Sequence, residues 1–221
     1  MKRWATWLGV AGLLVSQATG ATAAPTQWSS AVGGNNHWYE RISNPPLLWG
    51  AALNAAAAST FDPDGAGPLP ALQGYLATIT SAAEQRFLTS TFGADPEYWI
   101  AGSDATTEGT WKWVAGPENG TTFWMGGPSP GGTVVGYANW MPGEPANVVG
   151  NEDFAIANWE VLDGVFTDRW AAKCATECVH PYMIEYGGAV SAAAVPEPAT
   201  LSLLLTGAAV AIAWRRRFSN R

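Results

Sequence analysis

The chain has 221 residues, with 18 acidic and 11 basic side chains and a formal net charge of −7. Six of the basic residues lie before residue 24 or after residue 214, so the part between is more acidic than the chain as a whole. Domains that bind nucleic acid carry clustered Lys and Arg, and this composition excludes that class. It suits divalent cations and uncharged ligands such as sugars.

Residues 1–23 have the pattern of a secretory signal peptide. Lys2 and Arg3 precede an apolar stretch over 4–15, and Ala21-Thr22-Ala23 supplies a small-x-small cleavage site. Glycines and polar residues shorten the apolar run, which disfavours an uncleaved anchor helix. We therefore expect export from the cytoplasm.

The other end reads Pro196-Glu197-Pro198, then an apolar segment over 199–214, then a basic tail to residue 221. Sixteen residues give a helix of roughly 24 Å, shorter than the ~30 Å hydrocarbon core. These three parts resemble the PEP-CTERM sorting signal of Gram-negative bacteria. The resemblance implies transient anchoring in the inner membrane, recognition by an exosortase, and delivery to the cell surface or the extracellular space. A plain tail anchor is the alternative.

Between these ends, 24–188 is one domain's worth of chain, and the Ala/Ser-rich stretch 189–195 is a linker. A strand is predicted over 35–43. Asn44, followed by two prolines, predicts the N-cap of a helix over 47–59. The inward face of that helix is predicted to contain Leu47, Leu48, Ala51, Ala52 and Leu53.

Asp62 and Asp64 are predicted turn formers. Ser81 and Glu84 form a capping box that opens a second helix, whose predicted inward residues are Ala83, Phe87, Leu88 and Phe92. Later strands are predicted over 74–79, 98–103, 110–116, 152–158, 164–170 and 181–186. The Gly- and Pro-rich stretch 116–150 is too long for an ordinary connection, which indicates a functional loop. Two early helices and a later sheet indicate an α+β fold.

The order of the motifs "WYERIS", "GYLATITSAAEQRFL", "YWIAGSDATTEGTWKWVAGP", "YANWMPGEP", "NEDF", "FTDRW" and "YMIEY" resembles a C-type lectin-like domain, over roughly 35–186. The resemblance implies a double-loop fold, in which two helices flank small antiparallel sheets and a long loop carries calcium sites. Trp99, Trp111 and Trp113 are then core residues. Trp140 is either core or a sugar-stacking platform, and the resemblance favours core.

The resemblance also implies a principal calcium site, built from Glu-Pro-Asn, a later Glu, and an Asn-Asp pair. Sugar hydroxyls complete the calcium shell there, and the proline is cis. The matching residues are Glu144 with Pro145, Glu152 and Asp168, whereas Ala146 and Thr167 replace two amide ligands. Asn147 substitutes for Ala146 if the loop is shifted by one residue. The predicted carbohydrate-binding set is therefore Glu144, Asn147, Glu152 and Asp168.

An auxiliary calcium site is more complete. The resemblance places its ligands at Asp104, Glu108, Asn147, Glu152 and Asp153, which are four carboxylates and one amide. Calcium takes six to eight oxygen ligands in flexible geometry, so this set is sufficient in kind. A solvated acidic loop without metal is the alternative.

Cys174 and Cys178 are the two cysteines of a chain expected to be exported, where disulfides form. A local disulfide is favoured over two free or metal-binding thiols. The cysteines typical of the family are absent, with Phe154 and Ile184 in their places. Neither His37 nor His180 carries a predicted site.

Three functions follow. The leading hypothesis is a non-catalytic carbohydrate-binding module for an extracellular polysaccharide or surface glycan, assisted by calcium. The second is a protein-binding or structural matrix module of the same fold. An enzyme is disfavoured, because nothing in the sequence indicates the defined carboxylate separation and raised pKa that a glycosidase pair needs.

Overall fold

The structure is a computed structural model that describes residues 24–65, 71–94, 96–148, 150–158, 160–162, 165–174, 176 and 178–187. The predicted signal peptide, linker and sorting signal, including the apolar segment 199–214, lie outside these ranges. Within them, no helix is both long and apolar enough to cross a bilayer.

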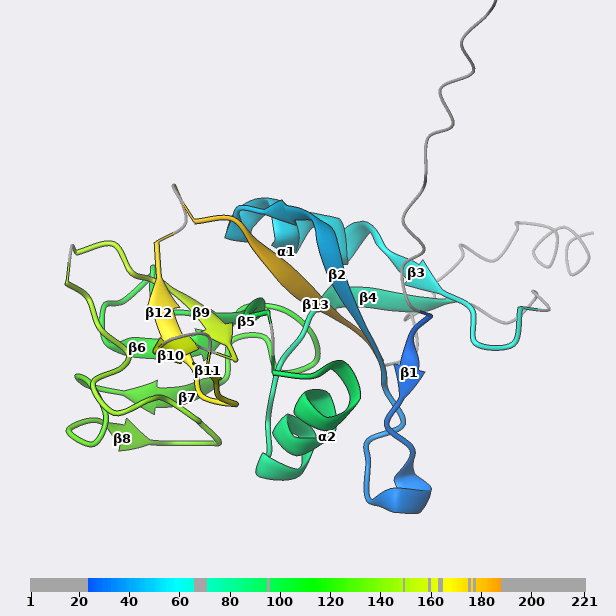
Figure 1. Cartoon of the computed structure of the whole chain (residues 1–221), viewed down its shortest axis with the longest axis horizontal. Coiled ribbons are helices and arrows are strands. Elements are labelled where there is room, and N and C mark those ends of the chain that lie inside the picture. Colours follow the sequence, from blue (N-terminus) through cyan, green and yellow to red (C-terminus); the bar gives the residue numbers. More distant parts are fainter. Residues whose placement is uncertain are drawn as a thin grey trace, which may run out of the picture.

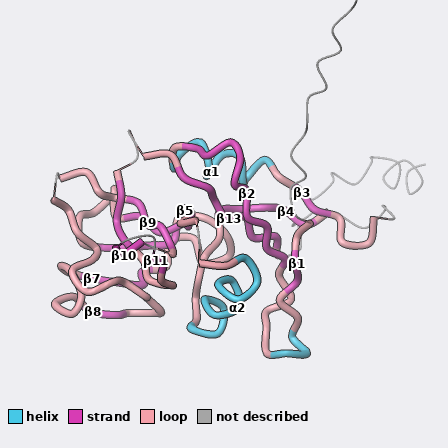
Figure 2. The backbone as a smooth tube through the Cα atoms, viewed as in Figure 1, coloured by secondary structure: helices cyan, strands magenta, loops and turns pink. Residues whose placement is uncertain are grey.

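Over the residues that the structure describes, the fold consists of two α-helices and many short strands, arranged as in Figures 1 and 2. The helices are α1 (Trp49–Ala58) and α2 (Ala82–Phe92), and Ser30–Val32 forms one 3-10 turn. The strands are β1 (Thr26–Gln27), β2 (Trp38–Leu47), β3 (Thr60–Phe61), β4 (Leu72–Leu76), β5 (Tyr98–Ser103), β6 (Thr110–Trp113), β7 (Thr122–Met125), β8 (Thr133–Val134), β9 (Phe154–Ala157), β10 (Glu160–Leu162), β11 (Val165–Phe166), β12 (Ala171–Lys173) and β13 (His180–Tyr186).

One large sheet runs in the order β1-β2-β13-β5-β6-β7-β8, with β4 on β13 and with β9 joining β5 to β12. Its pairings are antiparallel except the β13–β5 contact. Figure 1 shows α1 and α2 on opposite sides of the central strands, and β6, β7 and β8 grouped at one end. This architecture confirms the predicted α+β class.

The first helix begins later than predicted. Asn44, Pro45 and Pro46 belong to β2, and the helix starts at Trp49 without a side-chain cap. Strand β2 continues to Leu47 because that residue pairs with His180 on β13, and this tertiary pairing overrides the local cap pattern. The prediction of an N-cap at Asn44 is therefore wrong.

The buried face of α1 also differs from the prediction. It consists of Trp49, Ala52 and Ala56, whereas Leu48 and Ala51 are exposed. Of the residues predicted to face inward, Ala52 is buried as expected. The indole N–H of Trp49 donates a hydrogen bond to the backbone oxygen of Ile100 at 3.0 Å. The helix is thus fixed to β5 by an aromatic anchor at its first residue.

The second helix begins as predicted, since the Ser81 hydroxyl accepts a hydrogen bond from the Glu84 N–H at 3.1 Å. Its buried residues are Glu84, Gln85 and Leu88, so two polar side chains face inward. Ala83, predicted to face inward, is exposed. Glu84 is buried because it accepts hydrogen bonds from the N–H and the hydroxyl of Thr80, at 2.8 and 2.9 Å.

Tryptophans fill the core, as the sequence predicts. Trp99, Trp111, Trp113 and Trp140 are all at most 3% exposed. Trp140 forms a β-bridge with Trp170, and their rings lie 5.8 Å apart at a steep angle. A ring so deeply buried cannot serve as a sugar-stacking platform, which confirms the core interpretation of Trp140.

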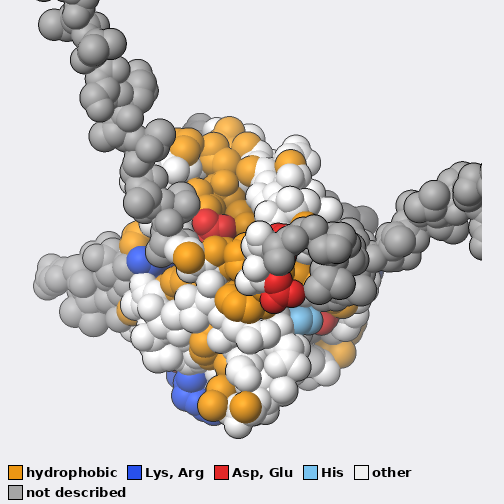
Figure 3. Space-filling view, turned by 90° about the vertical axis from the view of Figure 1, so that its right-hand side faces the viewer, with side chains coloured by type: hydrophobic (Ala, Val, Ile, Leu, Met, Phe, Trp, Pro, Cys, Tyr) orange, Lys and Arg blue, Asp and Glu red, His pale blue; other side chains and the backbone are white. Residues whose placement is uncertain are grey.

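The face of the molecule shown in Figure 3 exposes few basic side chains. On the face shown in Figure 3, acidic side chains lie near the centre, and Lys and Arg side chains appear only toward the left-hand margin. This distribution agrees with the acidic composition of the domain.

Candidate functional site

The site begins at the turn that follows β5. The Asp104 N–H donates to the backbone oxygen of Asp153 at 3.2 Å, which brings together two of the predicted calcium ligands. Asp104 Oδ2 accepts a hydrogen bond from the Gly109 N–H at 2.9 Å. The residue is only 4% exposed, and its second carboxylate oxygen, Oδ1, is buried without a hydrogen-bond partner among the described residues.

The negative charges of Asp104, Glu108 and Asp153 lie close together at this turn. Burial raises the pKa of Asp104 to about 6; the Gly109 hydrogen bond opposes this shift, and the charges of Glu108 and Asp153 add to it. Burial and the Glu108 charge also raise the pKa of Asp153. Such mutual repulsion is relieved when a cation binds between the groups.

The facing wall is the segment that follows Glu144. The Glu144–Pro145 peptide bond is cis, as the resemblance implies. The Asn147 side-chain oxygen accepts from the Glu152 N–H at 3.3 Å, and Glu152 Oε2 accepts from the Val148 N–H at 2.7 Å. Asn147 and Glu152, both predicted ligands, are therefore adjacent.

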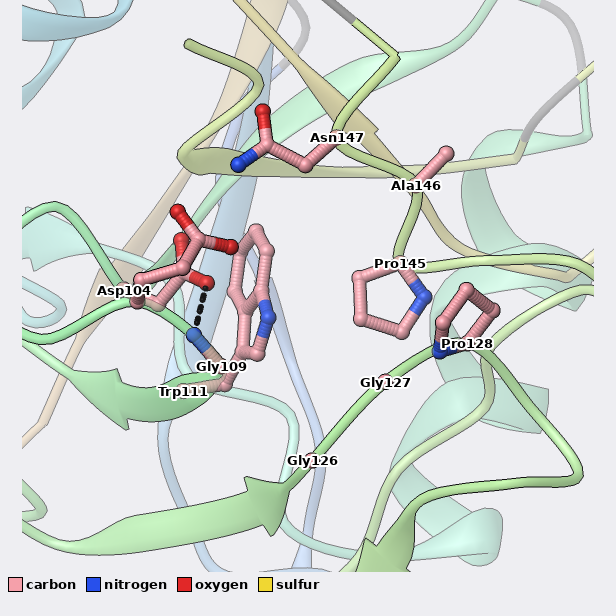
Figure 4. Close-up of a pocket in the computed structure, with 10 residues that line it drawn as sticks. Asp104, Gly109, Trp111, Gly126, Gly127, Pro128, Pro145, Ala146 and Asn147 are labelled. Atoms are coloured by element: carbon pink, nitrogen blue, oxygen red, sulfur yellow. Dashed lines mark hydrogen bonds between the residues drawn. The ribbon is translucent and has the colours of Figure 1, made fainter. Parts of the chain in front are cut away.

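A pocket of about 240 Å³ lies between these two walls. Figure 4 shows the Asp104 carboxylate and Asn147 on one side of it, and Pro128 and Pro145 on the other. Among the residues that the structure describes, the lining consists of Asp104, Glu108, Gly109, Trp111, Gly126, Gly127, Pro128, Pro145, Ala146 and Asn147. We call this the 104–147 pocket.

Glu144 does not line this pocket. Its Oε2 accepts two backbone hydrogen bonds, from Ala146 N–H at 2.8 Å and from Ala172 N–H at 2.9 Å. The carboxylate therefore joins the cis-proline segment to strand β12. Ala172 is also the residue of β12 that faces Glu144, and it offers no side-chain oxygen to a metal.

Asp168 lies away from the other predicted ligands. In the β9–β12 pair, Lys173 lies opposite Phe154 and Ala171 opposite Ile156. Asp153 precedes β9 and therefore lies near the end of β12, whereas Asp168 precedes the start of β12. The Asp168 backbone oxygen accepts from the Asn139 side chain at 2.7 Å. The structure thus does not bring Asp168 together with Glu152.

The residues around the 104–147 pocket supply the type of ligand atom that calcium prefers. The set is oxygen-only, and the buried, unpartnered Oδ1 of Asp104 is the atom that a cation would satisfy. Within the described ranges, no three His, Cys, Asp or Glu side chains converge on one point at metal-binding distance.

The two cysteine sulfurs lie 3.0 Å apart as thiols in hydrogen-bond contact. Burial, together with the Cys174 thiol, raises the pKa of Cys178 to about 11. The spacing suits oxidation to the predicted disulfide.

Part of this site is not predicted by the sequence. Gly126, Gly127 and Pro128 line the 104–147 pocket although none was a predicted site residue. The available signal was the Gly- and Pro-rich stretch 116–150, which indicated a functional loop but not which of its residues face Asp104.

Comparison with known proteins gives two family matches. A family model described as the lectin C-type domain matches residues 71–164, and one described as the PEP-CTERM protein-sorting motif matches 194–217. The chain is therefore similar to the lectin C-type domain over residues 71–164 and to the PEP-CTERM sorting motif over residues 194–217.

Two relatives are similar over part of their length. Halomucin of Haloquadratum walsbyi is 35% identical over 161 residues, which cover 73% of this chain and 2% of halomucin. C-type lectin domain family 4 member K of Homo sapiens is 36% identical over 78 residues, which cover 35% of this chain and 20% of that protein. The chain spans only a small part of either relative.

Among solved structures, the C-type lectin CEL-I from Cucumaria echinata is similar, with 23% identity and a TM-score of 0.49. The match covers 74% of this chain and 97% of CEL-I.

Proposed function

We propose that this protein is an exported carbohydrate-binding module of the cell surface or extracellular matrix. Its long loop is held by one calcium ion at the auxiliary position. The ligands in this proposal are Asp104, Glu108, Asn147, Glu152 and Asp153. When bound, calcium would supply two positive charges that offset half of the charge on these four carboxylates, and it would fix the two walls of the 104–147 pocket.

The buried Oδ1 of Asp104 is the single observation that carries the calcium part of this proposal. A buried carboxylate oxygen without a partner is costly, because it has lost water and gained no donor. The neighbouring Glu108 and Asp153 increase that cost by repulsion. A divalent cation removes both penalties.

The carbohydrate part is supported by the lectin C-type domain match and by the human relative, which is named a C-type lectin. Export is supported by the PEP-CTERM match. We propose that an exosortase recognises Pro196-Glu197-Pro198 while the segment 199–214 anchors the chain transiently in the inner membrane.

Calorimetry with calcium, followed by a glycan array with and without EDTA, tests this function. We expect one calcium per chain and glycan binding that weakens in EDTA. Asp104→Asn should weaken calcium binding at least tenfold, because it removes a ligand charge. Asp64→Asn, in the exposed 62–65 turn, is the matched control and should leave binding unchanged. Absence of glycan binding in both conditions would refute the carbohydrate proposal.

A protein-binding or structural matrix module is the second candidate. The observation that favours it is the Glu144 carboxylate, which is hydrogen-bonded to backbone, beside Ala146 and Ala172, which carry no oxygen ligands. This candidate predicts that no glycan binds, with at most a structural calcium ion whose removal lowers the melting temperature. The glycan array therefore separates the two functions.

A further inference from the structure

We propose that two copies of this chain associate through the outer edge of strand β8, with Val134 of one copy opposite Val134 of the other. This inference goes beyond the proposed function and does not depend on it, because the surface concerned has no part in the calcium or the carbohydrate proposal.

Strand β8 (Thr133–Val134) is the last strand of the large sheet. Among the described residues its only neighbour in the sheet is β7, and Figure 1 shows β8 as the outermost strand of the group formed by β6, β7 and β8. A strand with a single neighbour leaves backbone N–H and C=O groups on its other side, where another strand can pair with them. The outer edge of β8 is therefore suited to a further strand.

The hydrogen bonds between β7 and β8 show which backbone groups point outward. Val134 lies opposite Trp124 on β7. The N–H of the next residue, Val135, donates to the Phe123 oxygen at 2.9 Å, which makes that neighbouring pair a hydrogen-bonded one. Because hydrogen-bonded and non-hydrogen-bonded pairs alternate in an antiparallel ladder, the N–H and C=O of Val134 point away from β7.

A second copy of the chain suits this edge because the edge is complementary to itself. When two β8 strands lie antiparallel about a two-fold axis, the Val134 N–H of each copy donates to the Val134 C=O of the other. The strand has only two residues, so this pairing contains two hydrogen bonds. The association is therefore weak, and it depends on concentration.

The distribution of charge favours the same contact. The chain has a formal net charge of −7, so two copies repel each other over much of their surface. Residues 119–143 contain no Asp, Glu, Lys, Arg or His, and β8 lies within this stretch. Two copies can therefore approach along β8 without bringing like charges of this segment together.

Apolar side chains beside the edge would be covered by the contact. Met125, Val134 and Val135 are 49%, 54% and 54% exposed. The position of β8 is fixed by close packing, because a Cβ at Gly132 would lie 2.3 Å from the ring of Trp124. The edge is thus already formed in the single copy, which lowers the ordering cost of association.

Sedimentation of the full-length protein tests the association. Between about 10 µM and about 1 mM, the mass of the wild type should rise from that of one chain toward that of two. Val134→Lys should raise the dissociation constant at least tenfold, because it places two positive charges opposite each other across the axis. Val32→Lys, at a side chain that is 77% exposed on the 3-10 turn, is the matched control and should associate as the wild type does.

Cross-linking of the full-length protein tests the register. In the proposed pairing the two Val134 Cα atoms are about 5.5 Å apart, within the range that a disulfide spans. Val134→Cys should therefore form a disulfide-linked dimer under mild oxidation, whereas Val32→Cys should not. A wild type that stays monomeric, association that Val134→Lys does not weaken more than Val32→Lys does, or a Val134→Cys variant that gives no more dimer than Val32→Cys would overturn the proposal.

Discussion

The Tyr39 hydroxyl donates a hydrogen bond of 2.6 Å to Oε1 of Glu84, joining strand β2 to helix α2 inside the core. Glu84 is 1% exposed and Tyr39 is fully buried. The same hydroxyl lies 3.1 Å from Oε1 of Glu185, which also contacts His37 Nδ1 at 2.6 Å. Two buried carboxylates therefore lie on either side of one phenol.

This arrangement predicts that the domain is more stable in mild acid than in mild base. Burial and the charge of Glu185 raise the pKa of Glu84 from 4.5 to about 7. An acid that binds its proton more tightly when folded stabilises the fold while protonated, so the stabilisation is lost as pH rises from about 4.5 through 7. A shift of this size corresponds to about 3 kcal/mol at most.

The titration of His37 also makes the domain more stable at low pH than at high pH. Its hydrogen bond to Glu185 raises the pKa of His37 above 6.5, so its contribution is complete below pH 6.5 and is lost above its folded pKa. Other groups whose charges couple to Glu84 are Tyr39, Tyr75, Tyr98 and Tyr137, and burial raises the pKa of each, which keeps them neutral in this range. These tyrosines therefore do not change the direction in which stability is predicted to vary with pH.

Urea unfolding at pH 5.5 and pH 8, in EDTA, measures this effect. Glu84→Gln keeps the shape but cannot titrate, so the loss of stability between the two pH values should be smaller than in the wild type. Asp64→Asn serves as control and should keep the wild-type slope. An equal slope in Glu84→Gln would show that Glu84 does not carry the pH dependence.

The burial of two polar residues on α2 is a feature that the sequence does not predict. The period of apolar residues predicted the helix, and the Ser81 cap is confirmed by its hydrogen bond. The burial of Glu84 and Gln85 was not predictable, because their partners Tyr39 and Trp170 are 45 and 85 residues away in the chain. Local sequence patterns do not reveal contacts between residues that are so far apart in the chain.

The candidate site, too, could be predicted only in part from the sequence. The acidic turn from Asp104 and the segment around Asn147 were identified as possible ligands from motif order alone, and the structure places both at one pocket. The position of Asp168 could not be predicted, because it depends on the register between β9 and β12. Pro128 was missed because nothing local relates the Gly126–Pro128 turn to Asp104.

The Gln85–Trp170 contact yields a stability prediction. The Trp170 indole N–H donates to Gln85 Oε1 at 2.7 Å, and both residues are at most 1% exposed. Gln85→Leu leaves a buried indole N–H without its acceptor, which should cost about 1–3 kcal/mol in the free energy of unfolding. A double-mutant cycle with Trp170→Phe should show coupling of about 1 kcal/mol. Strict additivity of the two substitutions would argue against the bond.

The cysteine pair yields a redox prediction. In protein exported through an oxidising compartment, we expect Cys174 and Cys178 to be bridged, detected as resistance to thiol alkylation before but not after reduction. The bridge closes a very short loop, so reduction should lower stability by only about 2 kcal/mol. The Cys174→Ser variant is the control, because its remaining thiol should react without reduction. Rapid alkylation of both thiols in the exported wild type would exclude the disulfide.

Glu144 yields the prediction that best separates a structural role from metal binding. Its Oε2 accepts hydrogen bonds from the N–H groups of Ala146 and Ala172, so Glu144→Ala leaves two amides without their acceptor. We expect a loss of about 2 kcal/mol in the free energy of unfolding, measured by urea unfolding in EDTA. Glu144→Gln retains an acceptor oxygen in place and should lose less than half of that.

Calcium titration of Glu144→Gln completes this test. If the carboxylate fastens the cis-proline segment to β12, the amide variant should bind calcium as the wild type does, because Asp104, Glu108 and Asp153 keep their charges. If the carboxylate is instead a calcium ligand, Glu144→Gln should weaken calcium binding about as strongly as Asp104→Asn. A large loss of calcium affinity with wild-type stability in EDTA would therefore move the cation from the auxiliary position to Glu144.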